Sequence, residues 1–200
     1  MIRPLALASL TSVVLAIVAP TAAQTVEVTP FVGYQFGGEL DELGDEPIRR
    51  DLDSSPTWGL LVDVEVTHDT QVEIFYGSLG AELDRGIGDA FDVDEEILQI
   101  GAVREYDHGR PIIPYVGLTL GATRFEIGDD NDTRFSGAIA LGAKMLVSDN
   151  LGFRFDGRLF GSSTNSSTIG CVDGVCIGDP DTSVIWQYSI NAGIIVRFGR

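Results

Sequence analysis

Strict alternation of apolar and polar residues recurs along nearly the whole chain and constrains its fold more than any other feature. The alternating segments are about ten residues long or longer, and beyond residue 25 no segment keeps a 3.6-residue apolar period across three turns. Alternation of this length predicts β-strands with one apolar and one polar face. We expect eight such strands, at residues 26–37, 57–66, 71–83, 93–106, 112–125, 133–146, 151–161 and 184–198.

The connections between these strands alternate in length. Tight turns rich in Asp, Asn, His and Gly are expected at residues 67–70, 107–110 and 147–150. Longer polar loops are expected at residues 39–55, 84–92, 126–132 and 162–183. Short turns at one end and long loops at the other are typical of outer membrane barrels. We therefore predict an all-β fold, an eight-stranded antiparallel up-and-down transmembrane β-barrel, with the short turns and both chain ends in the periplasm.

A soluble lipocalin-like barrel would show the same alternation, so the choice depends on which face points outward. One face carries glycines and charges, as a narrow polar lumen requires, whereas the other face is nearly free of charge. A charge on a lipid-facing position costs roughly 2–4 kcal/mol at the bilayer midplane. Aromatic residues near the strand ends predict two interfacial girdles. The expected girdles are Phe36, Trp58, Phe125, Phe135, Phe160 and Trp186 near the long loops, and Tyr106, Tyr115, Phe153 and Phe198 near the short turns.

The N-terminal residues 1–23 are typical of a secretory signal peptide, which leaves residues 24–200 as the barrel domain. Arg3 supplies a positive charge, residues 5–18 are apolar but too short to span a bilayer comfortably, and small residues precede Gln24. A buried N-terminal helix or anchor is the alternative. Export favours a disulfide between Cys171 and Cys176, which would stabilise by about 2 kcal/mol. A thiolate metal site is the weaker alternative, because no histidine lies nearby.

Several stretches resemble the OmpA/OmpX-like eight-stranded outer membrane β-barrel domain family. They are VTPFVGYQFGG, PIIPYVGLTLGATRFE, FSGAIALGAKMLVSDNLGFRFDGRLFG and VIWQYSINAGIIVRFG, and the resemblance extends over nearly all of residues 26–199. It implies a small barrel filled by side chains, with no cofactor. It also implies outer membrane lipids and lipopolysaccharide as surroundings, and periplasmic chaperones and the barrel assembly machinery as partners. Such proteins usually end on an aromatic residue, whereas here Phe198 is followed by Gly199 and Arg200.

Charged residues on the polar face predict an ion network inside the lumen. An eight-stranded barrel has an interior just filled by side chains, and an unpaired buried charge is costly. We expect the network to close the periplasmic half of the lumen; a gate that opens when pairs switch is the alternative. Its predicted members are Asp63, Glu65, Glu73, Glu105, Lys144, Arg154, Asp156, Arg158 and Arg197, together with Glu27.

Catalysis is not expected from this sequence. Both histidines, His68 and His108, fall in short turns, which leaves no imidazole on the outer half to activate a serine as in lipid-modifying barrels. The carboxylates Asp94 and Glu96 could serve as acid and base, but we expect a solvated surface there. Residues 129–132 offer oxygen donors for weak Mg²⁺ or Ca²⁺ association, against a plain solvated turn, and no metal site is predicted.

The formal charge of −17 disfavours nucleic-acid binding, and it is concentrated in four segments. Residues 39–55, 82–96, 124–134 and 164–183 hold 21 of the 30 acidic residues and five arginines. We therefore expect a nearly neutral barrel with an acidic external crown, able to attract cations. The expected function is a non-enzymatic outer membrane barrel with a structural and surface-interaction role. The alternative is a narrow channel or a barrel that binds or transports a small solute.

Overall fold

The computed structural model describes residues 25–37, 39–43, 48–51, 54–84, 90–106, 111–127, 130–163, 168–172, 175–178 and 184–199. Within these residues the chain forms twelve β-strands. The signal peptide predicted at residues 1–23 and the expected turn at 107–110 lie outside the described residues. Among the residues that are described, no helix is long and apolar enough to cross a membrane.

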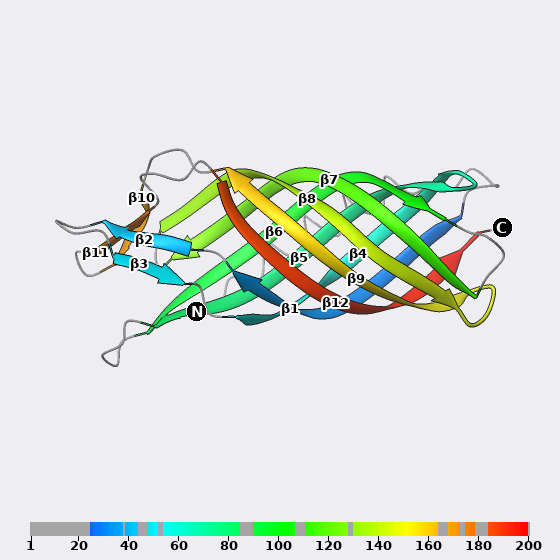
Figure 1. Cartoon of the computed structure of the whole chain (residues 1–200), viewed down its shortest axis with the longest axis horizontal. Coiled ribbons are helices and arrows are strands. Elements are labelled where there is room, and N and C mark those ends of the chain that lie inside the picture. Colours follow the sequence, from blue (N-terminus) through cyan, green and yellow to red (C-terminus); the bar gives the residue numbers. More distant parts are fainter. Residues whose placement is uncertain are drawn as a thin grey trace, which may run out of the picture.

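Eight of these strands close into one antiparallel barrel, in the order β1-β12-β9-β8-β7-β6-β5-β4 (Figure 1). They correspond to the eight predicted segments, so the predicted fold is confirmed. The barrel strands are β1 (Val26–Gly37), β4 (Ser55–Thr67), β5 (Thr70–Asp84), β6 (Ala90–Glu105), β7 (Ile112–Ile127), β8 (Asp130–Leu146), β9 (Leu151–Ser163) and β12 (Val184–Phe198).

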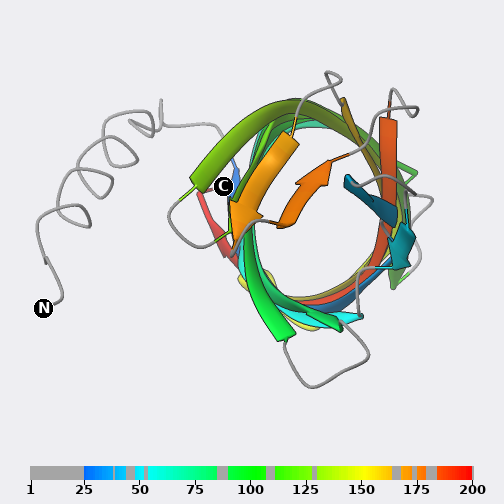
Figure 2. The same ribbon diagram turned by 90° about the vertical axis from the view of Figure 1, so that its left-hand side faces the viewer.

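Strand β1 closes the barrel because it pairs with β4 on one side and with β12 on the other. Its register sets Glu27 opposite both Asp63 and Arg197. A closed barrel leaves no unpaired strand edge, and every backbone polar group must be paired inside a lipid bilayer. Figure 2 shows the closed ring of strands from the long-loop end.

The strands are longer than the alternation suggested. The ladder between β5 and β6 continues to the pair Asp84 and Ala90, and that between β7 and β8 continues to Ile127 and Asp130. A strand of roughly 9–11 residues already crosses the membrane when it is tilted. These barrel strands have 12 to 17 residues, which is more than such a crossing requires.

Two of the expected long loops contain strands of their own. The strands β2 (Glu39–Leu43), β3 (Ile48–Asp51), β10 (Thr168–Val172) and β11 (Val175–Gly178) form a second sheet in the order β10-β11-β2-β3. This sheet lies at the long-loop end of the barrel, and β10 lies against β7 and β8 (Figures 1 and 2). The prediction of plain loops at 39–55 and 162–183 was wrong, because each of these strands is too short to show a distinct alternation.

The two faces of the barrel wall differ as expected. Aliphatic side chains such as Leu118, Leu141 and Ile190 lie on the outer surface, and their exposed fractions are 59, 64 and 64%. The opposite positions, one residue away along each strand, point into the lumen and are buried. The wall therefore presents an apolar surface to its surroundings.

The aromatic girdles need one correction. Trp58, Phe135, Trp186, Tyr106, Phe153 and Phe198 are exposed on the outer surface, and Phe36 is partly exposed. Tyr115, Phe125 and Phe160, which were also expected in the girdles, are buried inside the barrel at 3, 1 and 1% exposure. Their position near strand ends suggested an interfacial role, but the alternation of the strand sends these three side chains inward.

Candidate functional site

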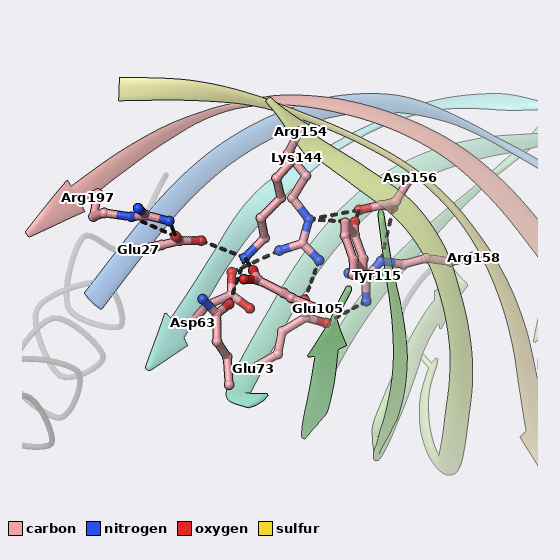
Figure 3. A network of polar contacts seen from close by, with 11 residues as sticks. Glu27, Asp63, Glu73, Glu105, Tyr115, Lys144, Arg154, Asp156, Arg158 and Arg197 are labelled. Atoms are coloured by element: carbon pink, nitrogen blue, oxygen red, sulfur yellow. Dashed lines mark hydrogen bonds and ion pairs between the residues drawn. The ribbon is translucent and has the colours of Figure 1, made fainter. Parts of the chain in front are cut away.

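The lumen near the short turns holds the densest cluster of charged side chains in the described part of the chain. Nine residues make up this cluster, called the ion network from here on, and Figure 3 shows their side chains meeting inside the barrel. All but Arg197 are almost completely buried. The ion network consists of Glu27, Asp63, Glu73, Glu105, Lys144, Arg154, Asp156, Arg158 and Arg197.

Strand register places acids on one wall and bases on the opposite wall. Glu27, Asp63 and Glu73 are consecutive cross-strand partners on β1, β4 and β5. Lys144 and Arg154 are cross-strand partners on β8 and β9. Like charges opposite each other destabilise a sheet, so each row needs the other to compensate it. The cations reach across the lumen to the carboxylates and thereby join opposite walls of the barrel.

Arg154 is the centre of the ion network. Its Nη1 atom lies 2.8 Å from Asp63 Oδ2, and its Nη2 atom lies 2.5 Å from Glu73 Oε2. Its Nε–H donates to the hydroxyl oxygen of Tyr115 at 2.7 Å and lies 3.2 Å from Asp156 Oδ2. The guanidinium also stacks over the Tyr115 ring, 4.5 Å from its centroid. One side chain thus connects strands β4, β5, β7 and β9.

Lys144 forms a second junction nearer the short turns. Its Nζ atom lies 2.6 Å from Glu27 Oε2, 2.6 Å from Glu105 Oε1 and 2.6 Å from Gln71 Oε1. The three donors of an ammonium group match these three acceptors. Glu27 is shared with Arg197, whose guanidinium binds the other carboxylate oxygen. This junction joins β8 to β1, β5, β6 and β12.

Arg158 and Asp156 extend the ion network toward the middle of the barrel. Arg158 Nη1 lies 2.9 Å from Glu73 Oε1, and Arg158 Nε lies 3.2 Å from Asp156 Oδ1. Asp156 also accepts hydrogen bonds from the Tyr115 hydroxyl at 2.8 Å and from the Asn191 amide at 2.9 Å. Glu73 and Asp156 therefore each bind both Arg154 and Arg158.

The structure brings together the predicted charged residues with one exception. Glu65 makes no ion pair with any described residue, and its side chain is partly exposed. The register between β4 and β5 shifts between Glu65 and Thr67, and the Glu65 amide donates to the Thr25 carbonyl at 2.9 Å. Glu65 lies at the rim of the barrel, where the regular alternation that would direct it inward ends.

Sequence reasoning missed the uncharged members of the site. Tyr115, Gln71 and Asn191 supply the hydroxyl and amide contacts that hold Arg154, Lys144 and Asp156. Their signal was present, since each occupies an inward position of its strand. The place of Tyr115 near a strand end suggests the lipid interface, but its position in the alternation directs it into the lumen.

An apolar layer of six residues lies directly on the long-loop side of the ion network. Phe75 and Leu61 each stand two positions from an ion-network carboxylate along their strands, and Phe75 stacks on Phe31 with ring centroids 5.3 Å apart. The Arg158 guanidinium lies over the Phe75 ring at 4.4 Å, which joins the two layers. The sequence indicated a polar lumen throughout. The structure shows instead that an apolar layer interrupts it. The apolar layer consists of Phe31, Leu61, Phe75, Ile97, Ala138 and Phe160.

Beyond the apolar layer, toward the long loops, the described part of the lumen carries amides, hydroxyls, the buried Glu95 carboxylate and the buried Arg134 guanidinium. Glu95 is 2% exposed and accepts hydrogen bonds from the amide groups of Gln35 at 3.4 Å and Gln187 at 3.0 Å. Nearby, Gln99 donates to Ser136 at 2.9 Å and accepts from Thr119 at 2.8 Å. Glu95 was counted in the external acidic crown, and that placement was wrong, because the strand directs it into the lumen.

The described residues contain no group of three or more His, Cys, Asp or Glu side chains that could hold a metal ion. His68 lies exposed in the turn between β4 and β5, whereas His108 is outside the described residues. The cysteine backbones are described, and Cys171 and Cys176 are cross-strand partners on β10 and β11. The acidic stretch 129–132 begins outside the described residues and continues into β8.

Comparisons with known proteins agree with this architecture. A family model described as the outer membrane protein beta-barrel domain matches residues 8–198. No curated protein sequence matches the chain. Among solved structures, the outer membrane protein OprG from Pseudomonas aeruginosa has a TM-score of 0.61 at 13% identity, with 90% of this chain and 98% of that chain covered.

Two further solved structures share the fold. Neisserial surface protein A (NspA) has a TM-score of 0.54 at 15% identity, covering 88% of this chain and 97% of its own. The outer membrane protein AlkL, solved in DMPC lipid bilayers, has a TM-score of 0.53 at 17% identity, covering 92% and 94%. At these identities the similarity concerns the fold. The family match places the protein in the outer membrane, in contact with its lipids, and the chain belongs to the outer membrane protein beta-barrel domain family.

Proposed function

We propose that this protein is a non-enzymatic outer membrane barrel whose lumen is closed and whose role is structural and surface-interactive. The observation that carries the proposal is the ion network, in which four cations and five carboxylates fill the half of the lumen nearer the short turns. The apolar layer supports the same conclusion, because it adds a second barrier on the long-loop side.

Passage of an ion would have to break contacts that compensate one another. Removing one partner of a buried ion pair leaves an uncompensated buried charge, at a cost of about 3–5 kcal/mol. A passing ion would then meet the rings of Phe31, Phe75 and Phe160, which offer no hydrogen bonds to replace its hydration. The two layers oppose permeation for different physical reasons, so they close the lumen more effectively together than either would alone.

Planar-bilayer recording of the purified protein tests the closed lumen. We expect the protein to insert without giving a steady conductance. Heat-modifiable migration of the same sample in gel electrophoresis verifies that the barrel is folded. A large and steady single-channel conductance of the unmodified protein would overturn the proposal and favour the narrow channel or solute-transporting barrel. Brief current spikes that scale with detergent and not with protein are the background against which both results are judged.

We also propose that the acidic segments form a cation-attracting surface at the extracellular end. The support is the concentration of acidic residues in residues 39–55, 82–96, 124–134 and 164–183, with the buried Glu95 left out. Most of these four segments belongs to the connections on the long-loop side. Exposed charges act over a distance of about 10 Å at 0.1 M salt. Equilibrium dialysis against Ca²⁺ at low and high ionic strength tests this. Salt-independent binding, or none, would contradict a diffuse acidic surface.

The pair Cys171 and Cys176 is proposed to form a disulfide in the second sheet. Their direct opposition on β10 and β11 supports this, because cross-strand partners lie at a Cα separation compatible with a disulfide. Thiol alkylation of the denatured, unreduced protein tests it by mass spectrometry. We expect no modification before reduction and two modified thiols after it, and two reactive thiols before reduction would refute the bond.

A further inference from the structure

The outer surface of the barrel has a groove that plays no part in closing the lumen. It has a volume of about 330 Å³ and is bordered by side chains of β7, β8, β9 and β12, among them Leu118, Phe135, Leu159 and Trp186. The polar group on its border is the Ser163 hydroxyl, which already donates to the Phe135 carbonyl at 3.1 Å. The groove is therefore an apolar recess.

Two opposed glycines produce this recess. Strand pairing forms one row of outward positions in the order Leu120, Gly137, Gly161 and Trp186. Neighbouring strands lie about 4.8 Å apart, so the backbones of Leu120 and Trp186 stand roughly 14 Å apart. The glycines between them carry no side chain, and Leu120 and Trp186 lean over them: a Cβ on Gly137 would lie 2.9 Å from Leu120 Cδ2, and one on Gly161 would lie 3.2 Å from Trp186 Cζ3. The row on the short-turn side has no such gap, because Ile139 and Leu159 face outward there.

The groove lies within the membrane-embedded wall, on its long-loop half. Phe135 and Trp186, exposed at 61 and 59%, are girdle residues on that side, and Leu118 and Ile139 belong to the apolar band. Long loops of such barrels face the exterior, so this half of the wall contacts the outer leaflet. The recess is continuous with a surface that contacts lipid throughout.

We infer that the groove binds one acyl chain of an outer-leaflet lipid. Inside a bilayer the hydrophobic effect does not favour one apolar site over another, because the lipid tails are apolar too. Packing contacts therefore decide which site an acyl chain occupies. An empty recess would forfeit dispersion contacts on every side, whereas an acyl chain lying against Phe135, Leu159 and Trp186 gains them. A second copy of this chain fits the groove less well. A two-fold contact brings the same surface of both copies together, so one recess would face the other recess with no side chain to fill either.

Trp186 provides a direct probe of occupancy, and Trp58 provides a matched control. These are the two tryptophans of the chain, both are exposed at 59%, and Trp58 lies on β4, away from the groove. The protein in detergent micelles is titrated with phosphatidylcholine brominated on one acyl chain, which quenches tryptophan fluorescence on contact. One variant carries Trp58→Phe, so that Trp186 reports alone, and the other carries Trp186→Phe. We expect a saturable loss for Trp186 and a shallow, non-saturating loss for Trp58.

Filling the groove should abolish the saturable part. In the Trp58→Phe background, Gly137→Leu places a side chain in the recess, and the Cβ atom would lie 2.9 Å from the mobile Cδ2 atom of Leu120. We expect the quenching midpoint to rise about tenfold or more, a change of at least 1.4 kcal/mol. The control is Gly157→Leu on the same strand pair, where an added Cβ meets no atom closer than 3.8 Å.

A second variant guards against misfolding. Phe135→Ala removes an exposed wall of the groove without touching the lumen, and it should weaken the saturable quenching while heat-modifiable migration stays unchanged. Equal, non-saturating quenching of both tryptophans would overturn the inference. So would a Gly137→Leu variant that is quenched like its Trp58→Phe parent. A dimer in micelles that Gly137→Leu dissociates would assign the recess to a second copy instead.

Discussion

Arg154→Met removes the centre of the ion network while keeping most of the volume of the side chain. Arg154 is 1% exposed and forms ion pairs with Asp63, Glu73 and Asp156. Glu73 and Asp156 retain Arg158 as a partner, whereas Asp63 has no other ion pair within the described residues. One buried carboxylate is left uncompensated, so the free energy of unfolding should fall by about 3–5 kcal/mol.

Equilibrium unfolding in urea, with the protein in phospholipid vesicles, measures this loss. The lipid-exposed Trp58 and Trp186 report unfolding through their fluorescence. Adding Asp63→Asn to Arg154→Met removes the orphaned charge and should restore about 0.5–3 kcal/mol. Arg104→Met is the matched control, because it breaks the exposed pair of Arg104 with Asp69, whose side chains are 61 and 45% exposed. Exposed pairs contribute little to stability.

The result also separates a structural network from a gate. If the network only closes and stabilises the lumen, Arg154→Met lowers stability and the bilayer stays without steady conductance, since the apolar layer remains. The same holds for Arg158→Met, which removes the cation next to Phe75. An Arg154→Met variant as stable as Arg104→Met would refute the energetic reasoning. Steady conductance from Arg154→Met or Arg158→Met would show that the ion pairs gate a pore.

Three further predictions concern the apolar layer, the barrel wall and the turn between β4 and β5. Phe75→Ala should lower the free energy of unfolding in urea by about 3–5 kcal/mol, because it leaves a cavity between the Phe31 and Phe160 rings and under the Arg158 guanidinium. A loss below about 1 kcal/mol would show that the apolar layer is loosely packed. Gly101→Ala should lower the free energy of unfolding by about 1–3 kcal/mol, because the new Cβ would lie 2.6 Å from the Cα of Thr119. The control Gly157→Ala should be nearly neutral, and equal effects of the two substitutions would contradict this reasoning. In the turn between β4 and β5, a hydrogen bond from the Thr67 hydroxyl holds the pKa of Asp69 below its ordinary value. This contribution to stability is present above the pKa of Asp69 in the unfolded chain and is lost as pH falls through its pKa in the folded protein. An NMR titration that gives Asp69 the ordinary pKa of an aspartate would refute the prediction.

Local chemistry, visible in the sequence, determined the strands and their two faces. Side chains alternate across a strand whatever its neighbours are, so positions such as Arg154, Asp156 and Arg158 could be assigned inward before any pairing was known. The same rule would have placed Tyr115, Phe125 and Phe160 inside. Their closeness to a strand end favours the lipid interface, but the alternation decides which face of the sheet a side chain takes.

Only the closed barrel decided which inward residues meet. Lys144 binds Glu27 across 117 residues of chain, and Arg154 binds Asp63 across 91. The height of each side chain in the lumen depends on the stagger between strands, which no single strand encodes. That stagger gathers four cations against five carboxylates, places the apolar layer next to them, and sets Gly137 opposite Gly161 on the outer wall. Alternation assigns each residue to a face, and barrel closure assigns it a partner.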